Sequence, residues 1–419
     1  MNESSARLLA LRDEALPALP AILGTEAQDV LAAAVELSGG RILSVRLSQV
    51  SWAPGRSITA VFETELALKD AAATREQFVA STAVTPPAGG MQLEDASGAR
   101  IAVWRLQDDP KLPGLTVAMD PRAARGLLDS LDVAPGPVSA RLRAYRPTRR
   151  AVVELVAGRQ RVFVKVVPPP QVRRLQSLHA GISPHLPVPR THGWSEQDGL
   201  VVLQAMPGLS LRKCLLDRRL ALPDPTTIMA LLDCIPTPPD GRTASSQATA
   251  ALAHAPLLRA LAPDCESLID TLVEELLEAG TAAPVVPVHG DLHEAQITVL
   301  SGKVAGLLDI DTAGMGERGD DWATLLGHLA VLREEAPPAT RHRIQSYAAR
   351  LMAVADQDVA EPTRLRKRVA AVIFGLASGP FRVQSSAWLD RTRSRLRLAE
   401  VWLQNARRHA KDESVLSRA

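Results

Sequence analysis

Hydrophobic and polar positions divide the chain into three stretches of different periodicity. Residues 1–40 repeat apolar side chains at helical spacing. Strand-like alternation follows in three segments, at 41–50, 58–66 and 101–106. A short helix is predicted near 121–131. We interpret residues 1–135 as an N-terminal α+β module, a cap or regulatory domain without a recognisable site of its own.

The middle stretch contains three closely spaced apolar segments and is assigned to residues 136–207. The segments lie at 141–145, 151–158 and 161–167, with short polar turns between them. This spacing predicts a small antiparallel sheet, followed by a helix at 171–182.

Helical periodicity dominates the last stretch, residues 208–419. Strands are predicted at 284–288 and 297–309, and long helices near 321–333, 340–356, 363–377 and 385–409. The predicted fold class is α+β: an N-terminal α+β module, a small antiparallel sheet, and a mainly helical lobe that carries one hairpin.

Composition narrows the functional classes. The 48 basic and 46 acidic residues give a net charge of +2, which argues against a nucleic-acid partner. Three scattered cysteines form neither a zinc motif nor a disulfide framework, which favours a reducing compartment. Neither a signal peptide nor an apolar run of about 18 residues is present. We therefore expect a cytoplasmic protein without a membrane partner; the sequence does not set its oligomeric state.

One predicted hairpin concentrates polar side chains at its end. Ser301-Gly302-Lys303 is expected to be a three-residue loop that sets Leu300 opposite Val304. That register places Gln296 opposite Leu308, beside Asp309.

Asp291 lies five residues upstream of Gln296, in the loop that leads into the same hairpin. Two carboxylates and an amide are oxygen ligands of the kind that Mg²⁺ prefers. The alternative is that these are ordinary polar turn residues.

Lys165 is the second signal, because only seven of the 48 basic residues are lysines. It interrupts an apolar strand and should share a face with Phe163 and Val167. The alternative is an exposed lysine on an edge strand. Together with a metal site, a buried lysine favours phosphoryl transfer, which needs a cation at the nucleotide phosphates.

Three motifs in order resemble the aminoglycoside phosphotransferase family, which has a protein-kinase-like two-lobe fold. They are HGDLHEAQ at 289–296, LDID at 308–311, and GMG at 314–316 ahead of DWA at 321–323. The resemblance covers roughly residues 138–335. The cap-plus-kinase layout is similar to that of maltokinases.

The resemblance implies an ATP- and Mg²⁺-dependent small-molecule kinase. Asp291 resembles the catalytic aspartate that orients the acceptor hydroxyl and accepts its proton, and Asp309 resembles the aspartate that chelates Mg²⁺. Gln296 stands where the family usually has asparagine, and its amide oxygen can still ligate the ion. Lys165 resembles the lysine at the α- and β-phosphates.

Further residues receive supporting roles from the same resemblance. The segment 204–208, with Gln204 and Met206, resembles the hinge whose backbone meets adenine. His289 is expected to fix the loop backbone and Asp321 to cap its helix. His293 is compatible with a structural or a chemical role. Asp311 is a further supporting candidate.

The chain departs from the family pattern in two places. The helix at 172–181 lacks the glutamate that steers the lysine. The glutamate between Lys165 and the hinge is Glu196, in a predicted turn, and Gln171 or Gln176 is the candidate to replace the missing side chain by hydrogen bonding. A glycine-rich phosphate loop is also missing, and Arg149 within RPTRR (146–150) is expected to hold phosphates instead. These departures motivate an alternative function, a nucleotide-binding pseudokinase with a regulatory or scaffolding role.

GMGERG at 314–319 matches a dinucleotide-binding pattern, but that interpretation fails. The strand ends several residues earlier, acidic residues precede the first glycine, and no second parallel strand follows.

Charge distribution bears on the acceptor. Residues 341–419 carry a net charge of +9 and the rest of the chain −7. A basic C-terminal segment is unsuited to a polycationic acceptor, so among sugar, polyol and antibiotic-like acceptors we expect a neutral or anionic hydroxyl compound such as a sugar or polyol. The alternative is that these arginines only coat solvated helix faces.

Overall fold

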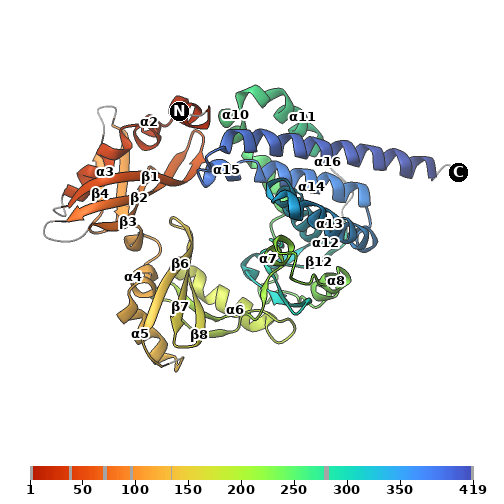
Figure 1. The fold of residues 1–419 in the computed structure, drawn as a ribbon, viewed down its shortest axis with the longest axis horizontal. Coiled ribbons are helices and arrows are strands. Elements are labelled where there is room, and N and C mark those ends of the chain that lie inside the picture. Colours follow the sequence, from red (N-terminus) through yellow and green to blue (C-terminus); the bar gives the residue numbers. More distant parts are fainter. Residues whose placement is uncertain are drawn as a thin grey trace. The chain divides into compact units, whose positions relative to one another are not determined.

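The computed structural model describes residues 3–36, 40–68, 73–94, 98–133, 135–277 and 283–416, and Figure 1 shows their fold. The chain divides into two compact units. The first comprises Met1–Arg174, Thr191–Gln204 and Gly379–Thr392, and the second comprises Leu175–Arg190, Ala205–Ser378 and Arg393–Ala419.

The first unit begins with three helices and an antiparallel sheet. The helices are α1 (Glu3–Ala10), α2 (Leu19–Leu23) and α3 (Ala27–Glu36). The strands are β1 (Gly40–Ala53), β2 (Ser57–Leu68), β3 (Thr74–Ser81), β4 (Met91–Glu94) and β5 (Arg100–Arg105), in the order β1-β2-β3-β5-β4. Helices at 1–40 and strands near 41–66 and 101–106 are confirmed, although Gly39 lies outside the described residues. The sequence missed β3, whose first half is polar, and β4, which has only four residues.

A second antiparallel sheet follows in the same unit. Its strands are β6 (Val138–Arg146), β7 (Arg150–Ala157), β8 (Gln160–Val166), β9 (Thr191–Ser195) and β10 (Leu200–Gln204), in the order β6-β7-β8-β10-β9. Helices α4 (Gly114–Met119) and α5 (Pro121–Ser130) lie beside this sheet (Figure 1). The strands predicted at 141–167 are confirmed.

One buried core joins these elements of the first unit. It includes Trp104 from β5 of the first sheet, Leu106 just after that strand, Leu115 from α4, and Val153 and Val164 from the second sheet. Burial of large apolar side chains contributes about 1.5–3 kcal/mol each. The segment between the two sheets is therefore fixed against the strands that follow it.

The second unit contains two small sheets. Strands β11 (Leu209–Ser210), β13 (Ile297–Leu300) and β14 (Lys303–Leu307) form the first, and β12 (Val285–Val288) pairs with β15 (Gly314–Glu317) in the second. Their loops carry the chemistry described below.

Helices make up most of the rest of the second unit. They are α7 (Leu211–Leu216), α8 (Thr226–Asp233), α9 (Gln247–Ala251), α10 (Ala255–Leu261), α11 (Glu266–Leu276), α12 (Arg318–Glu335), α13 (Pro338–Asp358) and α14 (Pro362–Leu376). Helices α6 (Val172–Ile182) and α16 (Trp388–Leu416) contribute residues to both units, and α15 (Gly379–Arg382) belongs to the first. The predicted α+β class is confirmed. Among the described residues, no helix has the length and apolar character needed to cross a membrane.

Candidate active site

The hairpin of β13 and β14 differs from its predicted register near the turn. Ser301 and Gly302 both have positive φ, 51° and 76°, and Leu300 pairs with Lys303. Two consecutive residues with positive φ build a tight two-residue turn, so the predicted three-residue loop and the pairing of Leu300 with Val304 are wrong.

A bulge at Ala305 restores the expected register at the other end. Thr298 pairs with Gly306 whereas Val299 pairs with Val304, so Ala305 is the extra residue. The Leu308 amide donates to the Gln296 carbonyl at 2.8 Å. Gln296 therefore lies opposite Leu308, as predicted.

This register brings the side chains of Gln296 and Asp309 together. Gln296 Nε2 lies 3.3 Å from Asp309 Oδ2, and both residues are half-buried. Asp309 has a left-handed backbone with φ 55°, a conformation that aspartate tolerates better than most residues and that concentrates at functional sites. Asp311 follows, half-buried, in the short helix Ile310–Thr312.

His289 connects the Asp291 loop to the end of β14. Its Nε2 donates to the Leu308 carbonyl at 2.8 Å, and its Nδ1 accepts the Asp291 amide at 3.3 Å. The His289 ring thus bridges the backbone amide of Asp291 and the backbone carbonyl of Leu308, the residue that precedes Asp309. His289 is 1% exposed, and both of its ring nitrogens bind backbone groups.

Asp321 holds the same loop from α12. It is fully buried, and its two carboxylate oxygens accept the amides of His289 and Gly290, each at 2.8 Å. The expected role as helix cap is wrong, because Glu317 occupies the N-cap position and Asp321 lies within the first turn of α12. Burial raises the pKa of Asp321, whereas His289 and the two amides oppose this shift.

Gly290 allows the loop to approach the following segment closely. Its φ is 80°, and a Cβ there would lie 2.5 Å from the Thr312 carbonyl oxygen. Since Thr312 Oγ1 also donates to the His289 carbonyl at 3.1 Å, the two segments that carry Asp291 and Asp309 are packed directly on each other.

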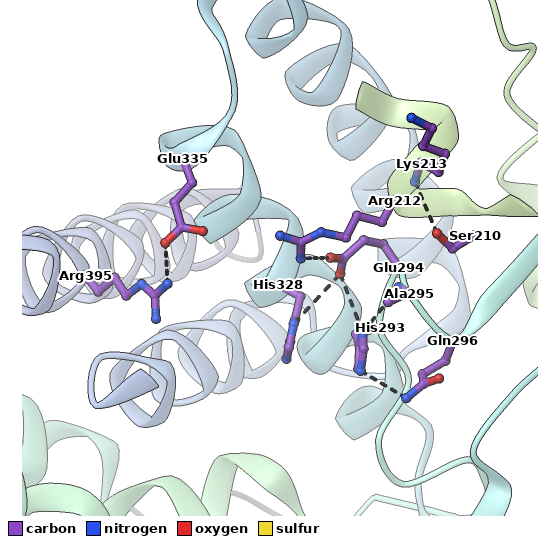
Figure 2. A network of polar contacts seen from close by, with 10 residues as sticks. All are labelled: Ser210, Arg212, Lys213, His293, Glu294, Ala295, Gln296, His328, Glu335 and Arg395. Carbon is purple, nitrogen blue, oxygen red and sulfur yellow. Dashed lines mark hydrogen bonds and ion pairs between the residues drawn. The ribbon is translucent and has the colours of Figure 1, made fainter. Parts of the chain in front are cut away.

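A polar network that the sequence did not predict surrounds His293 (Figure 2). Glu294 is fully buried, and Arg212 donates to its Oε1 at 2.9 Å. The rings of His293 and His328 stack with centroids 4.5 Å apart, and their Nδ1 atoms lie 3.9 and 3.8 Å from Glu294 Oε2. Among the described residues Glu294 Oε2 has no hydrogen-bond donor. His328 comes from α12, and no sequence spacing links it to this loop.

Both imidazoles are neutral at physiological pH. Burial lowers the pKa of His293 to about 4, helped by His328, and burial with Arg212 and Arg395 lowers the pKa of His328 to about 4. His293, Glu294 and His328 lie close enough for metal ligands. However, the ring planes are only 10° from parallel, so the two rings cannot direct lone pairs at one ion in these conformations.

Lys165 and Arg149 belong to the first unit. Lys165 lies on β8, between β7 and β10, and is 5% exposed. The alternative of an exposed edge-strand lysine is therefore wrong. Glu154 of β7, which the sequence did not single out, is also buried on this sheet face, where Arg143 and Arg161 bind its carboxylate.

A buried aspartate, Asp109, holds the turn from β6 to β7. Asp109 Oδ2 accepts the Tyr145 hydroxyl and the Thr148 amide, both at 2.7 Å, and its Oδ1 accepts the Lys111 amide at 2.9 Å. Thr148 has φ 59°, a strained value for a β-branched residue. Arg149 is exposed at the end of this turn.

The remaining candidates lie between the end of β8 and the segment that follows β10. Glu196 binds Arg173 at 2.9 Å, and both side chains are exposed. Gln171 is exposed and Gln176 half-buried. Gln204 ends β10, and the division between the two units falls directly after it. Met206 packs on Gly306, where an added Cβ would lie 2.5 Å from its Cε.

A comparison with protein-family models identifies the family of the chain. The sequence profile of the phosphotransferase enzyme family, APH, matches residues 148–362, just over half of the chain. The chain therefore belongs to this family, whose members are phosphotransferases with a protein-kinase-like fold. No curated protein matches the sequence significantly.

Several solved structures are similar to the chain at low identity. Macrolide 2′-phosphotransferase MphH from Brachybacterium faecium is 17% identical, covers 65% of this chain and 97% of its own, and gives a TM-score of 0.39. The gentamicin–APH(2″)-IIa complex is 13% identical, covers 68% and 98%, and scores 0.45. Ethanolamine kinase from Plasmodium vivax is 11% identical, covers 62% and 82%, and scores 0.41. At these values the neighbours do not bear on the acceptor.

Proposed function

We propose that the protein transfers the γ-phosphate of ATP to a hydroxyl of a small molecule, with Mg²⁺ as cofactor. The contact between Gln296 and Asp309 at 3.3 Å, next to the loop that bears Asp291, carries the proposal. It brings together two candidate ligand groups at the end of the hairpin, next to the loop with Asp291, which resembles the family's catalytic aspartate.

The residues present fit a hard divalent cation. Asp309 offers a carboxylate and Gln296 an amide oxygen, which are ligand types that Mg²⁺ takes together with phosphates and waters. In the proposed complex Asp309 and Gln296 would hold the ion. The ion would neutralise charge on the transferring phosphates.

Lys165 and Arg149 are assigned the role of binding the phosphates of ATP. Lys165 is a buried point charge at the centre of its sheet, and Arg149 is an exposed guanidinium on a turn that Asp109 holds. Guanidinium groups bind phosphate through two parallel hydrogen bonds, without the backbone amides of a glycine-rich loop. The backbone near Gln204 and Met206 is assigned to adenine.

Asp291 is assigned the role of accepting the proton of the acceptor hydroxyl. In the proposed reaction the acceptor oxygen forms a bond to the γ-phosphorus as the bond between that phosphorus and the bridging oxygen of ADP breaks. Asp291 accepts the hydroxyl proton and orients the attacking oxygen. His289, Asp321 and Gly290 hold the loop in place around it.

The acceptor is proposed to be a neutral polyhydroxyl compound such as a sugar or polyol. Several C-terminal arginines are bound by acidic side chains of the same unit, which removes much of the positive charge that an anionic acceptor would use. These are Arg364 and Arg368 with Glu317, Arg366 with Asp356, Arg393 with Asp264, Arg395 with Glu335, and Arg407 with Glu275.

Residues 1–135 are proposed to act as a cap or regulatory module for a small lobe at 136–207 and a helical lobe at 208–419. Support comes from the common core of the first unit and from Asp109, which connects the first stretch to the turn of the second.

A phosphorylation screen over hydroxylated metabolites, with ATP and Mg²⁺ and a mass readout of products, tests the function. Asp291→Asn should lower turnover about 10²–10⁴-fold. Asp270→Asn is the matched control, because Asp270 forms a half-buried ion pair with Arg259 of α10 and has no proposed role in the reaction. Nucleotide binding without turnover of any acceptor would instead support the pseudokinase alternative.

A further inference from the structure

His289 and His293 make the same local contact with the chain. In each, Nδ1 accepts the backbone amide two residues further on, at 3.3 Å, from Asp291 and Ala295 respectively. A neutral imidazole that accepts at Nδ1 carries its proton at Nε2. His289 uses that proton to bind the Leu308 carbonyl. His293 directs the corresponding proton at Gln296.

A single terminal atom of the Gln296 amide faces two groups with opposite requirements. It lies 3.2 Å from His293 Nε2 and 3.3 Å from Asp309 Oδ2. Amide nitrogen and oxygen have nearly the same shape, so the surrounding hydrogen bonds decide which atom stands there. Nitrogen satisfies the Asp309 carboxylate but meets the N–H of His293. Oxygen satisfies His293 but meets the carboxylate.

A cation resolves this conflict. With the oxygen of Gln296 facing both neighbours, His293 donates to one lone pair and a metal ion shared with Asp309 occupies the other. Adjacent oxygens in an octahedral Mg²⁺ site lie about 3 Å apart, given metal–oxygen distances of about 2.0–2.1 Å. The observed 3.3 Å is close to that separation.

We propose that His293 is a positioning residue that turns the amide oxygen of Gln296 toward the cation shared with Asp309. The inference rests on the proposed function and explains how glutamine replaces the usual asparagine. The longer side chain has one more rotatable bond, and the hydrogen bond from His293 fixes it.

The network in Figure 2 keeps the His293 ring in position. His328 covers one face of the ring, and the buried Glu294 lies beside its Nδ1 edge. Arg212 anchors Glu294 twice, because its guanidinium binds Oε1 and its backbone amide donates to the Glu294 carbonyl at 3.0 Å. Groups of this kind behind a metal ligand typically change metal affinity or activity about 10–100-fold.

Binding of Mn²⁺, measured by electron paramagnetic resonance with a non-hydrolysable ATP analogue, tests the inference without turnover. His293→Met and His293→Gln are a matched pair of similar length, of which only glutamine keeps a donor near the Nε2 position. Met should weaken Mn²⁺ binding about tenfold or more, and Gln should restore most of it. His342→Ala, at an exposed position of α13, should bind as the wild type does.

A double-mutant cycle identifies the route of the effect. In a Gln296→Ala background, His293→Met should produce no further loss of Mn²⁺ affinity, because its target is gone. Unchanged affinity of His293→Met, or an equal loss in both backgrounds, overturns the inference alone. Absence of Mn²⁺ binding by the wild type overturns the proposed function, and the inference with it.

Discussion

A buried aspartate holds the turn between β6 and β7, and another holds the loop between β12 and β13. The two segments carry different functional side chains. A buried aspartate distant in the sequence accepts backbone amides in each. Asp109 binds the amide of Thr148, and Asp321 binds those of His289 and Gly290. The turn exposes Arg149, whereas the loop carries the half-buried side chains of Asp291 and Gln296.

The difference lies in what surrounds each anchor. Asp109 also accepts a hydrogen bond from the Tyr145 hydroxyl. Burial, together with the negative charge of Asp109, raises the pKa of Tyr145 well above its ordinary value. The Tyr145 hydroxyl therefore stays protonated as a donor. The loop instead contains two imidazoles, His289 and His293, whose Nδ1 atoms accept backbone amides. The first anchor fixes a backbone shape, and the second fixes a shape together with the orientation of side chains.

Removing Asp321 should have the largest effect. Asp321→Ala leaves two buried amides without an acceptor, which costs about 2–6 kcal/mol of unfolding free energy at 1–3 kcal/mol each. Displacement of Asp291 should lower turnover at least about 100-fold. Asp321→Asn, which keeps one acceptor oxygen, should retain intermediate activity. Thermal melts and steady-state kinetics check both; turnover unaffected by Asp321→Ala would show that other contacts hold the loop.

Removing Asp109 should have a different kinetic signature. Asp109→Ala leaves the Tyr145 hydroxyl and the Thr148 amide unpaired, and should cost about 2–4 kcal/mol of unfolding free energy. Because the turn is assigned to phosphates, the KM for ATP should rise about tenfold with a smaller change in kcat. Tyr145→Phe removes one of these bonds and is the milder control. Equal losses in kcat for the Asp109 and Asp321 variants would contradict the prediction that Asp109 affects mainly the KM for ATP.

The sequence predicted the contacts that a single hairpin determines. Gln296 and Asp309 are thirteen residues apart and meet because two short strands pair, even though the turn and the bulge compensate each other in a way that periodicity does not reveal. Asp109 and Arg212 lie 39 and 82 residues from their partners Thr148 and Glu294. Such contacts depend on packing between distant elements, and polar residues in loops give no sign of which distant amide they will bind.

Lowering the pH should destabilise the folded protein through His328 of α12, whose ring stacks on that of His293. His328 has a folded-state pKa of about 4 against an ordinary 6.5, so the unfolded chain binds the proton first as pH falls. The stability that this group contributes is complete above about pH 6.5 and is lost as the pH approaches 4. The loss amounts to about 3 kcal/mol at 1.36 kcal/mol per pKa unit. Urea unfolding at several pH values should show a smaller acid-dependent loss in His328→Gln. Identical pH profiles would mean that His328 is not held neutral.

The smallest effect concerns backbone strain in the turn. Thr148 has φ 59°, where a side chain with a branched Cβ is disfavoured and glycine is not. Thr148→Gly keeps the amide that Asp109 accepts and should raise the unfolding free energy by about 0.5–1 kcal/mol. Thr148→Ala keeps a Cβ and should gain less. At Asp309, which has φ 55°, the same relief would remove a proposed metal ligand. Strain in the turn is therefore removable without loss of chemistry, whereas the strain at Asp309 belongs to a proposed metal ligand. A Thr148→Gly variant less stable than the wild type in urea unfolding would contradict this distinction.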